Sequence, residues 1–232
     1  MDVLCVVAHP DDEVIGIGGT LARHAAQGDT VHVCVLAETG VSRHETITEE
    51  VRERQQERRE ATRRGCAVLD VVDVTFHSYP ENEFDSVALL EIVKTVSAEV
   101  DRTEPSVVYT HHYGDLNVSH ELTCRAVQTA TRPLPDSNVE RVLAFETLSS
   151  SEWSVPDGRN AFTPTTFIDV SDVLDRKLAA LAEHEAELRD LPHPRNVETI
   201  RRNAQVWGAK CGVDAAEPLE LLRDVRASDE RI

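Results

Sequence analysis

Short apolar, β-branched runs alternate along the chain with amphipathic stretches. The apolar runs predict buried strands at 2–8, 31–36, 68–76, 106–110, 141–146 and 166–170. The amphipathic stretches predict helices at 18–27, 46–64, 86–100, about 120–130, 171–189 and 197–212, and the last two complete the fold. Strands that alternate with helices form a mostly parallel sheet with helices on both faces. We therefore expect an α/β fold, and 232 residues fit a single domain over 1–232.

The charge and the hydropathy of the chain exclude two classes of partner. The formal net charge of -18 argues against nucleic acid, because phosphate binding needs a basic surface. No apolar run reaches the roughly 18 residues of a membrane span, and residues 1–8 lead straight into a polar motif, so we expect neither a span nor a cleavable signal. Five cysteines without a CxxC pair fit a reduced, cytoplasmic setting. The expected partner is a small molecule, and a homo-oligomer is left open.

Lysine is almost absent from this acidic chain. The three lysines are Lys94, Lys177 and Lys210, against 42 Asp and Glu. Such a surface stays hydrated in concentrated salt, where self-repulsion is screened. The composition therefore favours a halophilic source, with an ordinary acidic cytosolic protein as the alternative.

A polar motif with suitable metal ligands follows the first predicted strand. An imidazole from His9 and a carboxylate from Asp12 are zinc ligands, and Pro10 between them stiffens the turn. Asp11 is left over, and a carboxylate beside a metal-bound water is placed to accept its proton. The motif therefore predicts half of a hydrolytic metal site with Asp11 as the general base.

Two other interpretations of this region are a helix N-terminus without a metal and a dinucleotide-binding loop. Asp11, Asp12 and Glu13 would also be favoured at a helix N-terminus by the macrodipole, without any metal. The glycines at 16–19 are not a dinucleotide loop, because the GxGxxG spacing is missing and acidic residues lie where a pyrophosphate would bind.

A second polar cluster, at 110–120, follows the predicted strand 106–110. Catalytic zinc usually takes three protein ligands, and His120 is the expected third one. It falls in the first turn of a helix that Asn117 or Ser119 can cap. The remaining candidates for an orienting role, transition-state stabilisation or an alternative ligand are His111, His112 and Asp115.

Residues 8–13, 18–20 and 110–120 together resemble the PIG-L/LmbE-like N-acetylglucosaminyl deacetylases. The similarity covers nearly the whole chain. It extends to Glu152-Trp153, to 192–195, and to Gly212-Val213 and Ala216-Glu217.

This resemblance implies a Rossmann-like fold and zinc at His9, Asp12 and His120, with Asp11 acting on the zinc-bound water. It also implies removal of an acetyl group from an N-acetylated amino sugar or its conjugate. Histidine and carboxylate ligands equally accept Fe²⁺, Mn²⁺ or Co²⁺. Further substrate contacts are expected from Arg43, Asn82, Trp153 and His193.

The chain departs from the family pattern at Asn117. Several members have a histidine three residues before the last ligand, where this chain has Asn117. An asparagine can donate a hydrogen bond to an oxyanion but cannot deliver a proton. Protonation of the leaving amine then falls to Asp11 or to a histidine, and the candidates are His111, His112 and His193.

Two other functions stay open at this point. The same metal chemistry would serve an amidase or esterase with a non-sugar substrate. A non-catalytic protein that binds metal or sugar would also keep the ligands.

Overall fold

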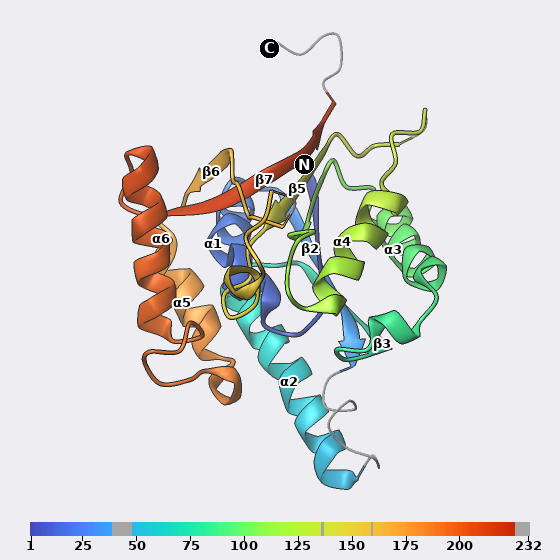
Figure 1. Ribbon diagram of the computed structural model, residues 1–232, viewed down its shortest axis with the longest axis horizontal. Helices are drawn as coiled ribbons and strands as arrows, with labels where there is room; N and C mark the ends of the chain where they lie inside the picture. Colours follow the sequence, from blue (N-terminus) through green and yellow to red (C-terminus); the bar gives the residue numbers. More distant parts are fainter. Residues whose placement is uncertain (39–47, 136, 159, 226–232) are drawn as a thin grey trace.

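All seven strands belong to one sheet in the computed structural model, which describes residues 1–38, 48–135, 137–158 and 160–225 (Figure 1). The strand order is β3-β2-β1-β4-β5-β7-β6. The first five of these strands are parallel, whereas β7 runs antiparallel to both its neighbours. The strands are β1 (Asp2–Val7), β2 (Thr30–Glu38), β3 (Asp73–Pro80), β4 (Val107–His111), β5 (Arg141–Phe145), β6 (Thr166–Asp169) and β7 (Ala216–Asp224).

Helices cover both faces of this sheet (Figure 1). They are α1 (Asp12–Ala26), α2 (Glu49–Val68), α3 (Leu89–Thr103), α4 (Val118–Ala130), α5 (Leu174–Ala182) and α6 (Val197–Cys211). Apolar side chains of α1, α2, α5 and α6 pack in one core, and those of α3 and α4 pack in a second core on the opposite face. The α/β fold with a mostly parallel sheet is thus confirmed.

The order of the strands reverses between β1 and β4. The chain leaves β1 for α1 on one face of the sheet and leaves β4 for α4 on the other face. A crevice opens at the carboxyl ends of such a strand pair, and α/β proteins bind their ligands there. Both polar motifs of the sequence follow these two strands.

Several predicted boundaries are wrong. The first helix begins at Asp12 rather than at residue 18, because its glycines lie inside the helix where other elements approach closely. A Cβ on Gly16 would clash with the Phe145 ring, and one on Gly19 would lie 2.8 Å from Val170. The second helix likewise runs through Gly65 to Val68, so the third strand begins at Asp73.

The end of the chain also differs from the prediction. The helix expected at 171–189 is the shorter α5, followed by a 3-10 turn η3 at Glu185–Glu187. Within the described residues the two predicted helices are not the last elements, because β7 follows them and inserts antiparallel between β5 and β6. Its sequence is rich in leucine and acidic residues and has no β-branched run. Strand propensity therefore does not predict a strand there.

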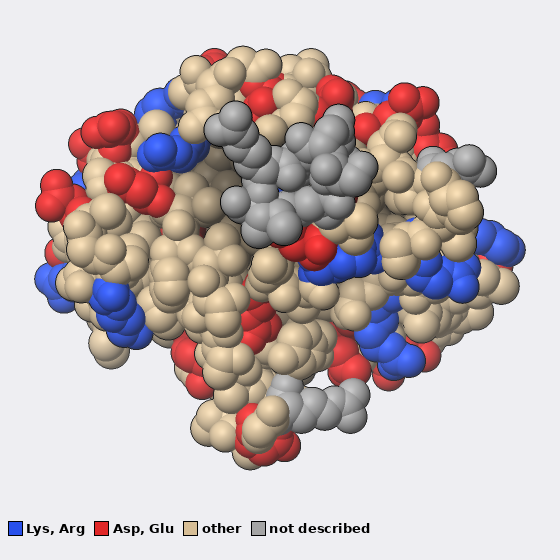
Figure 2. All heavy atoms as spheres, turned by 90° about the horizontal axis from the view of Figure 1, so that it is seen from above, with Lys and Arg blue, Asp and Glu red and all other residues tan. Residues whose placement is uncertain are grey.

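No helix in the described ranges is long and apolar enough to cross a bilayer. On the face of the molecule shown in Figure 2, acidic and basic side chains are interspersed rather than gathered by sign.

Candidate active site

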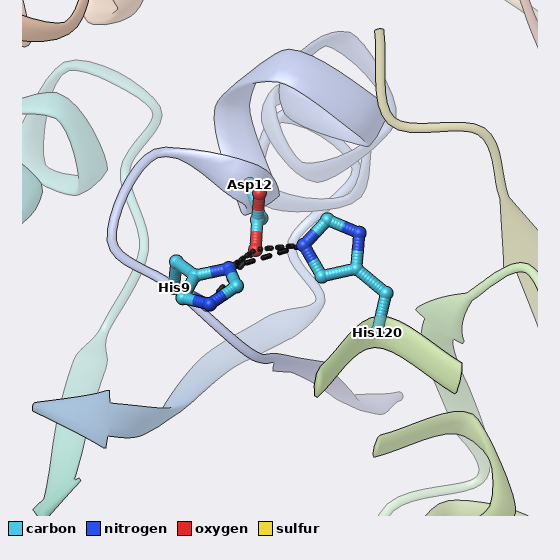
Figure 3. Close-up of side chains that lie close together, drawn as sticks. All are labelled: His9, Asp12 and His120. Atoms are coloured by element: carbon cyan, nitrogen blue, oxygen red, sulfur yellow. Dashed lines mark hydrogen bonds and ion pairs between the residues drawn. The ribbon is translucent and has the colours of Figure 1, made fainter. Parts of the chain in front are cut away.

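Three side chains from the two motifs converge at the carboxyl ends of β1 and β4 (Figure 3). His9 Nδ1 lies 3.1 Å from Asp12 Oδ2 and 3.1 Å from His120 Nε2, and His120 Nε2 lies 3.2 Å from Asp12 Oδ2. All three residues are buried. The structure thus brings together the three residues predicted as metal ligands, although 111 positions separate His9 from His120.

The geometry of this triad fits a small divalent cation. Ligand atoms placed tetrahedrally about 2.0–2.1 Å from zinc lie roughly 3.3 Å apart, close to the three observed separations. The Nδ1 of His9 and the Nε2 of His120 face each other. Each can donate its lone pair to the same cation when that nitrogen carries no proton. Burial works against ionisation of Asp12, but the charge of His120 outweighs it and holds the pKa of Asp12 well below the usual range. Two imidazole nitrogens and an ionised carboxylate form a suitable donor set.

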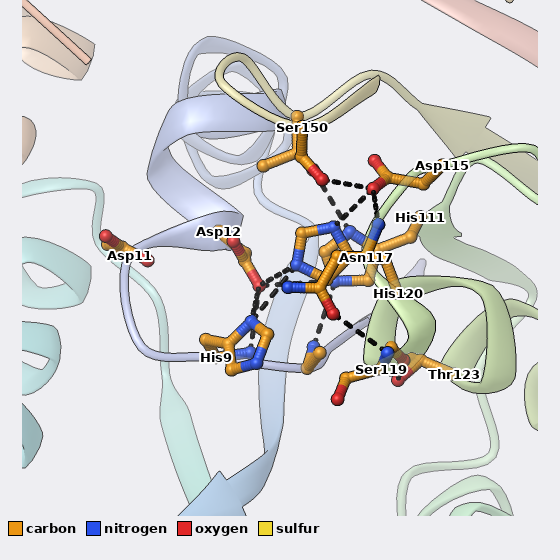
Figure 4. A network of polar contacts seen from close by, with 12 residues as sticks. His9, Asp11, Asp12, His111, Asp115, Asn117, Ser119, His120, Thr123 and Ser150 are labelled. Carbon is orange, nitrogen blue, oxygen red and sulfur yellow. Dashed lines mark hydrogen bonds and ion pairs between the residues drawn. The ribbon is translucent and has the colours of Figure 1, made fainter. Parts of the chain in front are cut away.

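Asp115 orients His120 from the opposite side of its ring (Figure 4). The Asp115 Oδ1 lies 3.2 Å from His120 Nδ1 and accepts a hydrogen bond from Ser150, while its Oδ2 accepts one from Ser151 at 2.5 Å. Burial disfavours protonation of His120, yet the charges of Asp12 and Asp115 raise its pKa to about 10. The carboxylates around this ring thus attract positive charge, whether a proton or a metal ion.

Asp11 occupies a strained turn beside the triad. Its backbone is left-handed, with φ at 101°, and Glu13 Oε2 accepts a hydrogen bond from its N–H at 3.1 Å. Arg195 Nη1 donates to Asp11 Oδ2 at 3.0 Å, whereas Oδ1 has no hydrogen-bond partner in the described part of the chain. Burial raises the pKa of Asp11 to about 7 against the opposing charge of Arg195.

A cavity of about 580 Å³ lies in front of His9 and Asp11. Besides Asp11, three of the predicted substrate or catalytic residues line it, namely Asn82, Asn117 and His193. Asn117 caps α4 by accepting a hydrogen bond from Ser119 N at 2.8 Å, and its amide donates to Asn82 Oδ1 at 2.9 Å. Trp153 contacts His193 edge to face. Arg43 lies outside the described residues.

His111 is not among the cavity-lining residues. Its Nε2 accepts a hydrogen bond from Ala8 N at 2.9 Å, so its Nδ1 is free to donate to Thr147 Oγ1 at 3.1 Å. Burial lowers the pKa of His111 to about 4, with the charge of His120 adding to the effect. These bonds fix a neutral ring that stacks on His120 at 3.9 Å between centroids.

His112 points away from the cavity, toward β7. Its Nδ1 lies 2.7 Å from Glu220 Oε2 and its Nε2 lies 2.9 Å from the Asn160 carbonyl. Burial works against protonation, but these two partners outweigh it and raise the pKa of His112. His112 therefore ties the loop after β4 to β7 and to the loop that precedes β6.

Arg58 and Arg195, two of the four arginines that line the cavity, were not predicted as site residues from the sequence. Arg58 of α2 faces Glu81 at 3.4 Å and Glu187 at 3.3 Å. Arg195 directly follows the His-Pro pair of residues 193 and 194, so the signal was present, but nothing local shows that it meets Asp11 184 positions away.

A second group of potential ligands lies beneath α3, formed by Cys34, His77 and Glu99. Arg102 already donates two hydrogen bonds to Glu99 Oε2, at 3.0 and 2.7 Å. The guanidinium neutralises the carboxylate, and we interpret this group as an ion-pair network.

The fold and this site define an α/β protein with a His-Asp-His cluster at the switch point of its sheet and, beside it, a second carboxylate that lies outside the cluster. Residues 4–131, more than half of the chain, match the family model described as PIG-L, GlcNAc-PI de-N-acetylase. The chain belongs to this family.

Relatives named as deacetylases match over most of the chain. The 1D-myo-inositol 2-acetamido-2-deoxy-alpha-D-glucopyranoside deacetylase of Thermomonospora curvata is 28% identical over 244 residues, which cover 80% of each chain. The deacetylase YaiS of Escherichia coli K12 is 31% identical over 190 residues, covering 79% of this chain and 90% of the relative.

Solved structures share the fold. The N,N'-diacetylchitobiose deacetylase of Pyrococcus horikoshii has a TM-score of 0.74 at 20% identity and covers 96% of this chain and 84% of its own. The 4-carboxy-2-hydroxymuconate hydratase GalB of Pseudomonas putida also has a TM-score of 0.74, at 22% identity, with 100% and 99% coverage. The fold therefore serves more than one reaction, and the function must be argued from the site.

Proposed function

We propose that this protein is a metal-dependent N-deacetylase, which hydrolyses the acetamide of an N-acetylated amino sugar or its conjugate. One observation carries the proposal: His9, Asp12 and His120 converge to within 3.1–3.2 Å of one another beside Asp11. The relatives named as deacetylases of 2-acetamido sugars support the substrate class. Zinc is the proposed ion, and Fe²⁺, Mn²⁺ or Co²⁺ would suit the same ligands.

Asp11 would act as the general base. A divalent ion held by the triad would polarise the acetamide carbonyl and lower the pKa of a water molecule. The unpartnered Oδ1 of Asp11 is available to take the proton of that water, because Arg195 occupies Oδ2 only. A cation next to Asp12 would also favour the ionised form of Asp11.

Asn117 would donate a hydrogen bond to the oxyanion. One N–H of its amide donates to Asn82 Oδ1, and the second N–H is left for the substrate. A new C–O bond forms and the C–N bond then breaks, which releases acetate and the amine.

The proton for the departing amine would come from Asp11, which has just received one, or from His193. The Nδ1 of His193 accepts a hydrogen bond from Arg195 N at 3.0 Å, so its Nε2 can carry a proton into the cavity. His111 and His112 are engaged elsewhere and do not line the cavity. Because Asn117 cannot deliver a proton, Asp11 and His193 are thus the two remaining candidates for protonating the departing amine.

Metal analysis and an amine-release assay test this proposal together. Protein purified without chelator should contain about one equivalent of divalent metal per chain, and it should release amine from N-acetylated sugars. A panel of non-sugar amides and esters addresses the broader hydrolase, for which the shared fold of the hydratase leaves room. Metal without turnover of any substrate would favour a binding protein instead.

A further inference from the structure

A half-exposed tryptophan stands beside the cavity. Trp153 ends the 3-10 turn η2 (Ser151–Trp153), and 53% of its surface is exposed. Its ring meets the His193 ring edge to face, with 6.0 Å between centroids and 84° between planes. Because His193 lines the cavity and the indole packs on its ring, the indole lies beside the cavity wall.

The backbone next to Trp153 is fixed by hydrogen bonds, although the indole ring itself is exposed. Glu152 accepts hydrogen bonds from the N–H groups of Ser149 and Ser150 at 2.7 and 3.1 Å. Arg195 Nε donates to Ser149 Oγ at 2.7 Å, which joins this turn to the loop of His193. The same arginine holds Asp11, so the exposed ring is fixed relative to the proposed catalytic carboxylate.

Two further apolar side chains are exposed on the same two segments. Val155 follows Trp153 by two residues and is 71% exposed, and Leu191 precedes His193 by two residues and is 53% exposed. The two segments that meet at the Trp153–His193 contact thus expose apolar side chains next to a cavity that is lined mainly by charged and polar residues. Tryptophan combines a large apolar face with little conformational freedom, and it often dominates the energetics of recognition.

We infer that Trp153 and His193 form a second sugar subsite, in which the indole packs against the C–H face of a pyranose ring linked to the acetamide-bearing ring. This inference rests on the proposed function. The acetamide would reach Asp11 at the bottom of the cavity, and the attached ring would lie at the rim. The preferred substrate is then an N-acetylated disaccharide rather than the free monosaccharide.

The ratio of kcat/KM for N,N'-diacetylchitobiose to that for N-acetylglucosamine measures this subsite. In Trp153→Ala the ratio should fall about tenfold, mainly through KM for the disaccharide, as expected for the loss of one apolar contact face. Trp153→Phe should retain most of the ratio, and Trp207→Phe is the matched control at the other tryptophan. An unchanged ratio in Trp153→Ala would overturn the inference, even if both rates fell together. A change of oligomeric state in Trp153→Ala that explained the lower ratio would also overturn the inference. The indole would then belong to an interface between copies of the chain.

If neither sugar is hydrolysed, the proposed function is contradicted, but the sugar subsite is not. A binding measurement then tests the subsite. The chain has only two tryptophans, so Trp207→Phe leaves Trp153 as the single indole. In the metal-loaded Asp11→Asn/Trp207→Phe protein, diacetylchitobiose should change the indole emission saturably, and N-acetylglucosamine should do so at least tenfold more weakly. No response to the disaccharide, or a stronger response to the phenyl glycoside of N-acetylglucosamine, would contradict a subsite built for a second sugar ring.

Discussion

At the scale of single residues, Asp11 and Asp12 are adjacent carboxylates in different environments. Asp12 faces two imidazoles of the triad, whereas Asp11 faces an arginine and the cavity. The two side chains point in different directions (Figure 4), and the backbone of Asp11 is left-handed at this turn.

Replacing Asp11 with Asn should lower kcat by about 10²- to 10⁴-fold while the metal content stays near that of the wild type, because only the proton acceptor is lost. Asp12→Asn is the matched variant and should lose the metal. Steady-state kinetics and elemental analysis of the two proteins check this. Loss of metal in Asp11→Asn would make Asp11 a ligand.

Asp115 should raise the affinity of the site for a metal ion without being a ligand. Asp115→Asn removes the charge that orients His120, and we expect metal affinity to fall roughly 10- to 100-fold. Competition with a chelator of known affinity measures the change. The exposed Asp175→Asn serves as the control, and equal affinities in both variants would rule out the orienting role.

At the scale of elements, a break inside α1 depends on two residues from other parts of the chain. Ile17 has non-helical angles, φ at -134° and ψ at 24°. Lys177 of α5 donates to the Ile15 carbonyl at 2.9 Å, while Glu217 of β7 accepts from Gly19 N at 2.9 Å. The ion pair between Lys177 and Glu217, at 2.6 Å, thus supplies partners for backbone groups that the break exposes.

Lys177→Met should therefore destabilise the protein by about 3–5 kcal/mol, because it leaves the Glu217 carboxylate buried without its cation. Denaturant unfolding measures the difference. Lys94→Met removes an exposed ion pair and should cost below about 1 kcal/mol. Equal effects of the two substitutions would show that the buried pair has no special role.

Glu99 links α3 to β3 and should contribute to acid stability. Burial opposes its ionisation, but hydrogen bonds from His77 and Arg102 lower its pKa to about 2. A carboxyl whose pKa is lower in the folded state stabilises the fold above its unfolded pKa of about 4.3, and this contribution fades as the pH falls toward 2. Glu99→Gln should lose on the order of 1–2 kcal/mol at pH 7 and show a flatter decline between pH 4.5 and 2 in urea unfolding. A decline as steep as in the wild type would assign the acid sensitivity to other groups.

At the scale of the whole molecule, the excess of 42 acidic over 24 basic residues sets the response to salt. Added salt shortens the screening length from about 10 Å at 0.1 M to about 3 Å at 1 M and so weakens self-repulsion. We expect the melting temperature to rise between about 0.05 and 1 M KCl, as scanning calorimetry can measure. A melting temperature that is highest at low salt would contradict the predicted halophilic character. The cytoplasmic location and the oligomeric state likewise stay predictions.

The sequence by itself determined the class of fold and most of the chemistry near each strand end. Apolar β-branched runs mark buried parallel strands because those strands are covered on both faces, and the polar residues after β1 and β4 stand out against them. His9 and Asp12 were predictable because they closely follow β1, and His120 because it lies in the first turn of the helix that follows β4.

Only the tertiary structure decided which distant segments meet. The insertion of β7, the pairing of Arg195 with Asp11 and the contact of Trp153 with His193 depend on the packing of the complete sheet and its last two helices. Local periodicity predicts which side of a segment is buried, but it does not predict which other segment covers that side. For that reason the proposed metal ligands could be predicted from their places after two strands, whereas the pairing of Arg195 with Asp11 could not.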